Sequence, residues 1–222
     1  MREIVLCENS RSILLRFSLF ILFLLLVAGC DRPQVTSEEF SEIDVSQEPE
    51  QNELKSKESI ILKITGDSEF TINPVAEYKI AAVLVGKKCY RDSWRGKVAP
   101  IDLVLVWGKL AEPERDKYIS YSQHDRWYFY ENKAGSPFNS SYVIAHSANN
   151  HIIPAGENIL RAVKTIEENE KVFLEGFLVS VKGRYKGENF RWNSSLKRTD
   201  TGDGSCEVFY VRRVRIGTKV YE

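Results

Sequence analysis

The chain has 222 residues, of which 43% are hydrophobic and 28% are charged, and its formal net charge is zero. This composition supplies one ordinary hydrophobic core, so a single globular domain is expected. Residues 59–222 carry twenty-five basic and twenty acidic side chains, an excess too small for a typical nucleic-acid-binding face, so no nucleic-acid partner is expected.

The N-terminus has the pattern of an export signal. Arg2, Arg11 and Arg16 precede a run of eleven residues at 17–27 that is apolar except for Ser18. This run is too short to span about 30 Å of hydrocarbon as a helix, which favours the core of a cleavable signal peptide. The sequence Val-Ala-Gly-Cys at 27–30 then resembles the lipobox of bacterial lipoproteins, in which small residues admit the peptidase and the thiol accepts a lipid.

The lipobox resemblance implies a place in the cell. Residues 1–29 would be removed, and Cys30 would carry diacylglycerol and a fatty acyl group such as palmitate; no other cofactor is predicted. Such an anchor would hold the protein permanently on a bacterial cell membrane, facing the periplasm or the exterior. Asp31 resembles the signal that keeps lipoproteins of enteric bacteria on the inner membrane. An ordinary secretory signal or an uncleaved signal anchor is the alternative.

Residues 30–58 are predicted to be a lipidated N-terminus followed by a flexible acidic tether. Positions 31–58 hold nine acidic and three basic residues, are rich in Glu, Ser, Gln and Pro, and show no steady hydrophobic period. Such a segment cannot bury enough apolar surface to offset the entropy lost on ordering. About 25 disordered residues would span about 25–30 Å on average.

From residue 59 onward the sequence consists of short β-rich stretches separated by turn residues. Gly176 is expected at a bulge or a sharp bend of one strand. A 3.6-residue period predicts a helix at 159–168, and 111–119 is a weaker helix candidate. Strands are expected at residues 60–64, 78–85, 101–107, 126–130, 141–145, 171–181, 190–192 and 207–216.

The predicted fold class of residues 59–222 is therefore mainly β, a β-barrel or a sandwich with one or two short helices. The C-terminal order of helix, long strand and two further strands is similar to that of a small closed barrel of OB type.

Two cysteines remain in the exported domain, Cys89 and Cys206, once Cys7 is cleaved away and Cys30 is acylated. In an oxidising compartment, one disulfide between them is the simplest outcome. Two buried free thiols, or a reactive thiol at Cys206, are the alternatives.

Two polar segments interrupt the strand pattern, HSANNHIIPA at 146–155 and RWNSSLKRTDTGDGSCE at 191–207. The first is interpreted as a loop, and a site is predicted where the two segments meet. The candidate binding or catalytic residues are His146, Ser147, Asn149, Asn150, His151, Arg191, Trp192, Ser194, Ser195, Arg198 and Asp200.

The same segments resemble a family of exported bacterial proteins of unknown function, with the patterns HSAN-x-H-x-IPA and RW-x-SSL-x-R-x-DTG-x-G-x-CE. The likeness extends over most of residues 78–211, including VWG at 106–108 and residues 123–128. It implies export but no particular reaction or ligand. Cys206 belongs to the family pattern and Cys89 does not, which argues against the disulfide.

Three kinds of chemistry fit these residue types. His146 and His151 could bind zinc with Asp200 or Cys206, but their spacing matches no recognised zinc motif, so no metal is predicted. Ser147, Ser194, Ser195 or Cys206 could act as a nucleophile with a histidine as base. An aromatic and basic groove could bind a glycan or an anionic headgroup through Trp107, Trp127, Tyr128, Tyr130, Trp192, Arg126, Arg191 and Arg198.

Each of these groups also has a purely structural interpretation. The imidazoles and amides could satisfy backbone groups, the serines could cap turns, and the aromatic side chains could belong to the core. The function that the sequence favours is a membrane-anchored envelope lipoprotein acting as a binding or assembly module for an envelope protein, a glycan or a lipid. The alternative is a small hydrolase or metal-dependent enzyme that uses the His146/His151 and Asp200/Cys206 segments.

Overall fold

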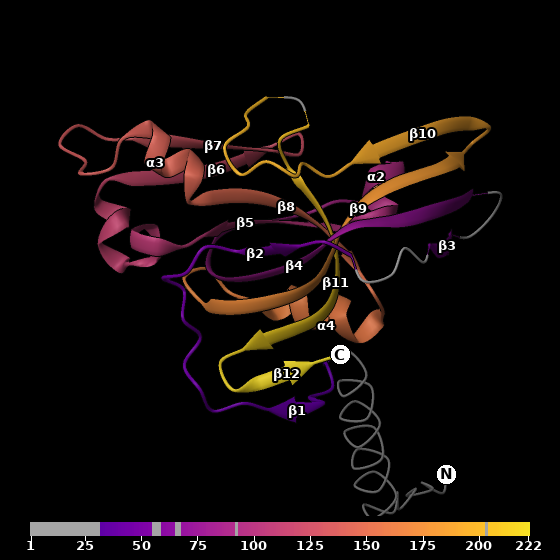
Figure 1. Ribbon diagram of the computed structural model, residues 1–222, viewed down its shortest axis with the longest axis horizontal. Helices are drawn as coiled ribbons and strands as arrows, with labels where there is room; N and C mark the ends of the chain where they lie inside the picture. The colour runs from indigo at the N-terminus through magenta and orange to yellow at the C-terminus, as the bar shows by residue number, and fades with distance from the viewer. Residues whose placement is uncertain (1–31, 55–58, 65–67, 92, 203) are drawn as a thin grey trace, which may run out of the picture. The chain divides into compact units, whose positions relative to one another are not determined.

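The computed structural model describes residues 32–54, 59–64, 68–91, 93–202 and 204–222. The chain divides into two units, Met1–Pro33 and Gln34–Glu222, and the second contains the strands and helices drawn in colour in Figure 1. The predicted signal peptide, Cys30 and Asp31 lie outside the described residues. Within those residues, no helix combines the length and the apolar character needed to cross a bilayer.

The described residues form strands for the most part, joined by short helices. The strands are β1 (Ser37–Glu38), β2 (Glu50–Asn52), β3 (Ile60–Ile64), β4 (Ser68–Cys89), β5 (Ile101–Val106), β6 (Ile119–His124), β7 (Trp127–Asn132), β8 (Ser147–Pro154), β9 (Lys171–Tyr185), β10 (Glu188–Asn193), β11 (Glu207–Ile216) and β12 (Lys219–Tyr221). The helices are α2 (Trp94–Val98), α3 (Ser140–Ala145) and α4 (Glu157–Thr165), with 3-10 turns η1 (Gly108–Ala111) and η2 (Pro113–Lys117). The predicted mainly β fold class is confirmed.

Five strands pair in a closed ring in the order β4–β5–β8–β11–β9–β4. Only the β8–β11 pair in this ring is parallel, with Asn150 opposite Glu207. Alternate side chains of each strand point inward, because successive residues of a strand face opposite sides. The interior is filled by apolar residues such as Ile80, Leu103 and Phe209, and α4 contributes Ile159, Ala162 and Val163 to the same core.

Bulges decide which face each part of the long strands buries. In β4 the register shifts between Pro74 and Ala76, where Val75 is the extra residue. Phe70 and Ile72 therefore pack in a second core with α2 and the far half of β9, whereas Tyr78 and Ile80 face the ring interior. This half of β4 extends away from the ring together with β3 and β10 (Figure 1).

Gly176 of β9 lies opposite a bulge in β11, between Val211 and Arg213. A Cβ atom at Gly176 would lie 2.0 Å from the carbonyl oxygen of Tyr210, so a side chain there would prevent the two backbones from approaching. The bulge expected near Gly176 is present, although the extra residue is in the partner strand.

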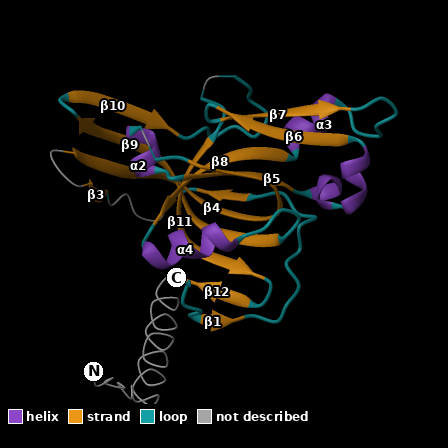
Figure 2. Ribbon diagram, turned by 180° about the vertical axis from the view of Figure 1, so that it is seen from behind, coloured by secondary structure: helices purple, strands orange, loops and turns teal. Residues whose placement is uncertain are grey.

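The β6–β7 hairpin covers the outer side of the ring beside β5 and β8. Its apolar residues share a third core with Val83 and Val106 of the ring and with Val143 of α3. Viewed from behind in Figure 2, the hairpin and α3 lie at the end of the unit opposite β1 and β12.

The prediction of a flexible tether over 30–58 is wrong for residues 34–54. Strand β1 pairs with β12, and β2 pairs with β4. Glu39 forms ion pairs with Arg213 and Arg215, and Ile43 is buried. Few large apolar residues suffice to order this segment, because basic side chains from β11 and backbone groups of β12 provide its partners.

Several elements expected from the sequence were correct and three were not. Strands at 60–64 and 207–216 have the predicted bounds. Residues 141–145 form helix α3 instead of a strand, because the Asn139 side chain accepts a hydrogen bond from Tyr142 N and caps the turn. Residues 147–154 form strand β8 instead of a loop. The weaker helix candidate at 111–119 consists of 3-10 turns.

Candidate functional site

The two polar segments meet in the structure. Strand β8 lies beside the start of β11, the Nδ2 atom of Asn149 lies 3.8 Å from Cys206 Sγ, and the rings of His151 and Trp192 are 4.6 Å apart between centroids. Residues 146–155 look like a loop in sequence because they are polar. They nevertheless form a buried strand, since the hairpin and the 191–207 segment provide hydrogen-bond partners for their side chains.

The alternation of β8 separates its candidate residues into two groups. Ser147, Asn149 and His151 face outward, toward the hairpin and the 191–207 segment, whereas Asn150 faces the ring interior between Ala148 and Ile152. Asn149 accepts a hydrogen bond from Gln123 Nε2 at 3.2 Å and donates to Arg126 O at 2.9 Å. Ser147 donates to Val143 O at 2.6 Å.

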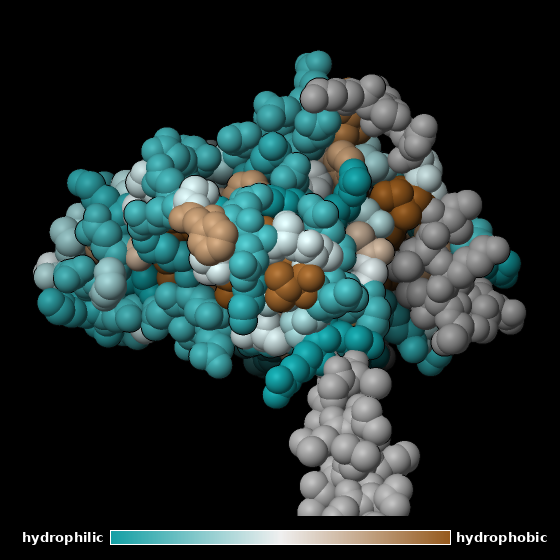
Figure 3. Space-filling view, turned by 90° about the horizontal axis from the view of Figure 1, so that it is seen from below, coloured by the Kyte–Doolittle hydropathy of each residue, from teal (hydrophilic) through white to brown (hydrophobic). Residues whose placement is uncertain are grey.

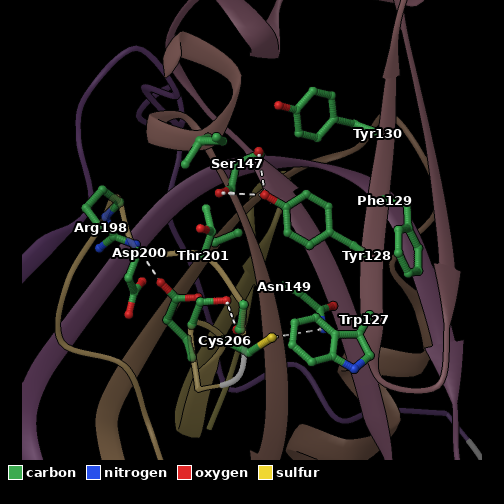
Figure 4. Close-up of a pocket in the computed structure, with 15 residues that line it drawn as sticks. Trp127, Tyr128, Phe129, Tyr130, Ser147, Asn149, Arg198, Asp200, Thr201 and Cys206 are labelled. Atoms are coloured by element: carbon green, nitrogen blue, oxygen red, sulfur yellow. Dashed lines mark hydrogen bonds and ion pairs between the residues drawn. The ribbon is translucent and has the colours of Figure 1, made fainter. Parts of the chain in front are cut away.

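A pocket of about 260 Å³ lies between strand β7 and residues 198–207 (Figure 4). One wall is aromatic and the opposite wall carries carboxylate, hydroxyl, guanidinium and thiol groups. The wall of β7 consists of Trp127, Tyr128, Phe129 and Tyr130, and the polar wall includes Arg198, Asp200, Thr201, Ser205, Cys206 and Glu207. Ser147 and Asn149 of β8 also line the pocket.

Tyr128 joins the aromatic wall to β8. Its hydroxyl lies 3.1 Å from Ser147 Oγ, and Figure 4 shows its ring directed toward that serine. Burial raises the pKa of the Tyr128 phenol, so the hydroxyl stays protonated at neutral pH. Phe129 is 54% exposed, so this part of the wall is accessible from solvent.

The polar wall contains a buried ion pair. Arg198 Nη1 lies 2.7 Å from Glu207 Oε1 and 3.2 Å from the hydroxyl of Tyr78, and its guanidinium lies over the Trp107 ring. Burial raises the pKa of the Glu207 carboxyl to about 7, and the charge of nearby Asp200 acts in the same direction. The second carboxylate oxygen of Glu207, Oε2, has no hydrogen-bond partner among the residues described.

The serines of the second segment hold its turns in place. Ser195 Oγ donates to Asp200 Oδ2 at 2.6 Å and accepts from Lys197 N at 3.0 Å. Ser194 Oγ donates to Ser195 O and accepts from Val208 N. Asp200 Oδ1 is buried without a partner within the described ranges. Neither serine contacts a histidine in these hydrogen bonds, so the segment contains no serine–histidine pair of the kind that acyl transfer needs.

The predicted disulfide is not formed, since Cys89 and Cys206 are both free thiols. Cys89 ends β4 opposite Ile101 of β5 and is exposed. Cys206 has other neighbours, since its Sγ lies 3.8 Å from Asn149 Nδ2 of β8. Burial raises the pKa of the Cys206 thiol to about 12, so this thiol is a poor nucleophile.

The two histidines do not converge. His146 stacks on Tyr142, and its Nε2 lies 3.2 Å from Glu48 Oε1. His151 lies four strand residues beyond Ser147, about 13 Å along β8, where its Nδ1 is 2.9 Å from Asp102 Oδ1. Over the described parts of the chain, no three His, Cys, Asp or Glu side chains are grouped as metal ligands.

The predicted aromatic and basic groove divides into separate clusters. Trp127, Tyr128 and Tyr130 line the pocket with Arg198, but Trp107 is fully buried behind Arg198. Trp192 contacts His151 and lies beside Arg126. Arg191 is exposed on β10 and bonds Asn193, away from the pocket.

Sequence reasoning missed four residues that matter here: Asp102, Phe129, Thr201 and Glu207. Asp102 could have been found, because a carboxylate inside the apolar run 101–107 must have a buried partner. It is fully buried and pairs with Arg126 Nη1 at 2.7 Å. The positions of Phe129 and Thr201 depend on the packing of the hairpin against the 191–207 segment, and no local pattern indicates it.

Comparison with known proteins gives no relative: the chain matches no family model, no curated protein and no solved structure.

Proposed function

We propose that this protein is a lipid-anchored lipoprotein of the bacterial envelope whose globular domain binds a glycan in the pocket between β7 and residues 198–207. The anchor rests on the lipobox resemblance at 27–30. The glycan rests on one observation above all. An aromatic wall, of which Phe129 is exposed, faces a polar wall that presents the side chains of Thr201 and Ser205.

A sugar suits both walls of this pocket. The apolar C–H face of a pyranose can pack on an aromatic ring, and ring faces carry the partial negative charge that attracts such groups. Sugar hydroxyl groups would donate to and accept from the hydroxyl groups of Thr201 and Ser205 on the opposite wall. Few convergent polar groups in a largely apolar hollow are typical of small-ligand sites.

The protonation and hydrogen bonding of the candidate thiol, serine and histidine side chains favour binding over catalysis. The Cys206 thiol is protonated at neutral pH because burial raises its pKa to about 12. Ser194 and Ser195 are engaged in turn hydrogen bonds, and His146 and His151 contact other groups. The hydrolase or metal enzyme that the sequence left open would need a nucleophile and a base in contact.

We further propose that the ring of five strands is a small barrel of OB type. The support is its connectivity, in which three antiparallel strands, β4, β5 and β8, are followed by α4 and then by β9 and β11, with β8 parallel to β11. Barrels of this type bind oligosaccharides and oligonucleotides on various loops. This analogy concerns the fold alone, and the ligand is argued from the pocket.

Glycan binding can be tested with the mature acylated protein in detergent micelles. Soluble fragments released from purified cell-wall sacculi, and chitotetraose as a defined sugar, would be titrated by calorimetry. Replacing Phe129 with Ala should weaken binding by about 3- to 10-fold, the value of one aromatic contact of about 0.5–1.5 kcal/mol. Phe40→Ala is the matched control, because Phe40 is an exposed phenylalanine that does not line the pocket. Absence of saturable binding, or equal loss in both variants, contradicts the proposal.

A further inference from the structure

The N-terminal segment is fixed to the domain from Gln34 onward. Gln34 N donates to Asn158 Oδ1 at 2.6 Å, and Asn158 Nδ2 donates to the carbonyl oxygens of Gln34 and Glu222 at 2.9 and 3.0 Å. Thr36 N donates to Val220 O at 2.8 Å. Gln34 therefore lies next to the N-terminal end of α4 and beside the C-terminal residue.

This attachment limits how far the domain can stand from a lipid on Cys30. Four residue steps separate Cys30 from Gln34, and a fully extended chain covers at most about 14 Å in four steps. A flexible tether of about 25 residues would have allowed about 25–30 Å on average. An acylated Cys30 thus holds the surface around Gln34 close to the headgroups.

Two exposed apolar side chains lie on this part of the chain. Phe40 is 80% exposed and Val35 is 41% exposed, and they stand on either side of β1. Phe40 has the largest exposed fraction among the large hydrophobic residues described. Figure 3, which views the side carrying β1 and β12, shows separate apolar patches on an otherwise hydrophilic surface.

Two acidic residues of this part of the chain, Glu39 and Glu42, form ion pairs with basic residues, which reduces the negative charge that the surface presents. Glu39 bonds Arg213 and Arg215, Glu42 Oε1 lies 2.7 Å from Lys171 Nζ, and Glu38 is opposite Lys219 in the β1–β12 register. A bilayer surface that approaches this segment therefore meets the Glu39 and Glu42 carboxylates already paired with basic side chains.

We propose that the segment 34–40 is a membrane-contact surface, with Phe40 and Val35 entering the headgroup region of the bilayer to which Cys30 is anchored. The inference rests on the lipid anchor proposed above. Apolar side chains at the interface add buried area to an acyl anchor and fix the orientation of the protein on the surface. Strand β7 and residues 198–202 lie at the opposite end of the unit from β1 and β12 (Figures 1 and 2), so the pocket would face away from this membrane.

An environment-sensitive dye can test the contact. The acylated protein would carry Cys89→Ser, which removes the exposed thiol, and either Phe40→Cys or Phe129→Cys labelled with a nitrobenzoxadiazole group. Both positions are exposed, and both proteins would be reconstituted into phosphatidylcholine vesicles. Intact mass would establish that each carries its acyl chains and a single dye.

The expected result is a blue-shifted emission at position 40 that lipid-borne doxyl groups quench, with aqueous emission and little quenching at position 129. Acylated protein with aqueous emission at position 40, or with equal quenching at both positions, overturns the contact surface and leaves the anchor intact. Protein without acyl chains overturns the anchor and this surface together.

Discussion

Arg198 and Glu207 form an ion pair of 2.7 Å at one end of the strand ring, where the guanidinium also reaches the Tyr78 hydroxyl and lies over Trp107. The pair links the 191–207 segment to the ring interior, because Glu207 is only 4% exposed and belongs to β11. It therefore fixes the polar wall of the pocket at the point where the 191–207 segment joins strand β11.

Replacing Arg198 with Met should destabilise the protein by about 3 kcal/mol at pH 8, because the Glu207 carboxylate loses its partner while remaining buried. The loss should be smaller at pH 5, where Glu207 is protonated and leaves no unpaired charge. Urea unfolding at both pH values measures this. Lys197→Met, at an exposed neighbour, should change stability little, and an equal loss at both pH values for Arg198→Met would contradict the assignment.

Glu207 should make the protein less stable as the pH rises from about 4.5 to about 7. Its pKa is raised by burial from an ordinary 4.5 to about 7, so the folded state binds the proton more tightly than the unfolded state. The stability from this proton is fully present below pH 4.5 and is lost as the pH rises through 7. In Glu207→Gln this pH-dependent part of the stability should disappear. Urea unfolding of the two proteins across this pH range measures the difference. Parallel pH profiles would show that Glu207 does not titrate in this range.

Asp102 should be essential to stability. It is fully buried, with Arg126 at 2.7 Å and His151 at 2.9 Å, so Asp102→Asn leaves the buried guanidinium without a counter-charge. The expected cost is about 3 kcal/mol, measured by chemical denaturation. Asp125→Asn is the control, since Asp125 is 82% exposed beside His124 and surface pairs contribute about 0–1 kcal/mol. Similar effects of the two substitutions would refute a structural role for the Asp102 cluster.

The two thiols of residues 34–222, Cys89 and Cys206, should react at very different rates. Cys89 is exposed, whereas Cys206 is partly buried with its pKa raised to about 12, and the thiolate is the reactive form. Iodoacetamide at pH 8 should modify Cys89 first, and Cys206 should react only after unfolding, as followed by peptide mass analysis without reductant. Recovery of a Cys89–Cys206 disulfide peptide would contradict the arrangement of strands described above.

Residues 39–41 should detach more readily from the rest of the domain when their basic partner Arg215 is replaced. Arg215 donates to Ser41 Oγ at 3.1 Å and pairs with Glu39 at 3.2 Å, so Arg215→Ala removes contacts that hold residues 39–41. Cleavage by a glutamate-specific protease at Glu38, Glu39 or Glu42 should become faster than in the unaltered protein. Arg184→Ala, at an arginine on β9 that bonds only Gly187 in the hydrogen bonds found, is the control. Unchanged cleavage in Arg215→Ala would mean that β-pairing alone holds the segment.

The sequence by itself determined the features that depend on local pattern. Branched and aromatic runs determined the strands, and the strand at 207–216 was predicted with its exact bounds. A 3.6-residue period located α4, and the mainly β class followed from these elements. The polarity of residues 146–155 and 191–207 also marked them as a pair of unusual segments.

The tertiary structure determined which of the polar segments are buried and ordered. Strand β8 is polar but buried, because the hairpin and the 191–207 segment bind Ser147, Asn149 and His151. Residues 34–54 look disordered by composition but are ordered, because Arg213 and Arg215 lie 170 or more positions away in sequence and yet contact Glu39. The composition of a segment indicates how much apolar surface the segment can bury by itself. The contacts described above depend instead on residues distant in sequence, which come close only when the ring of strands closes.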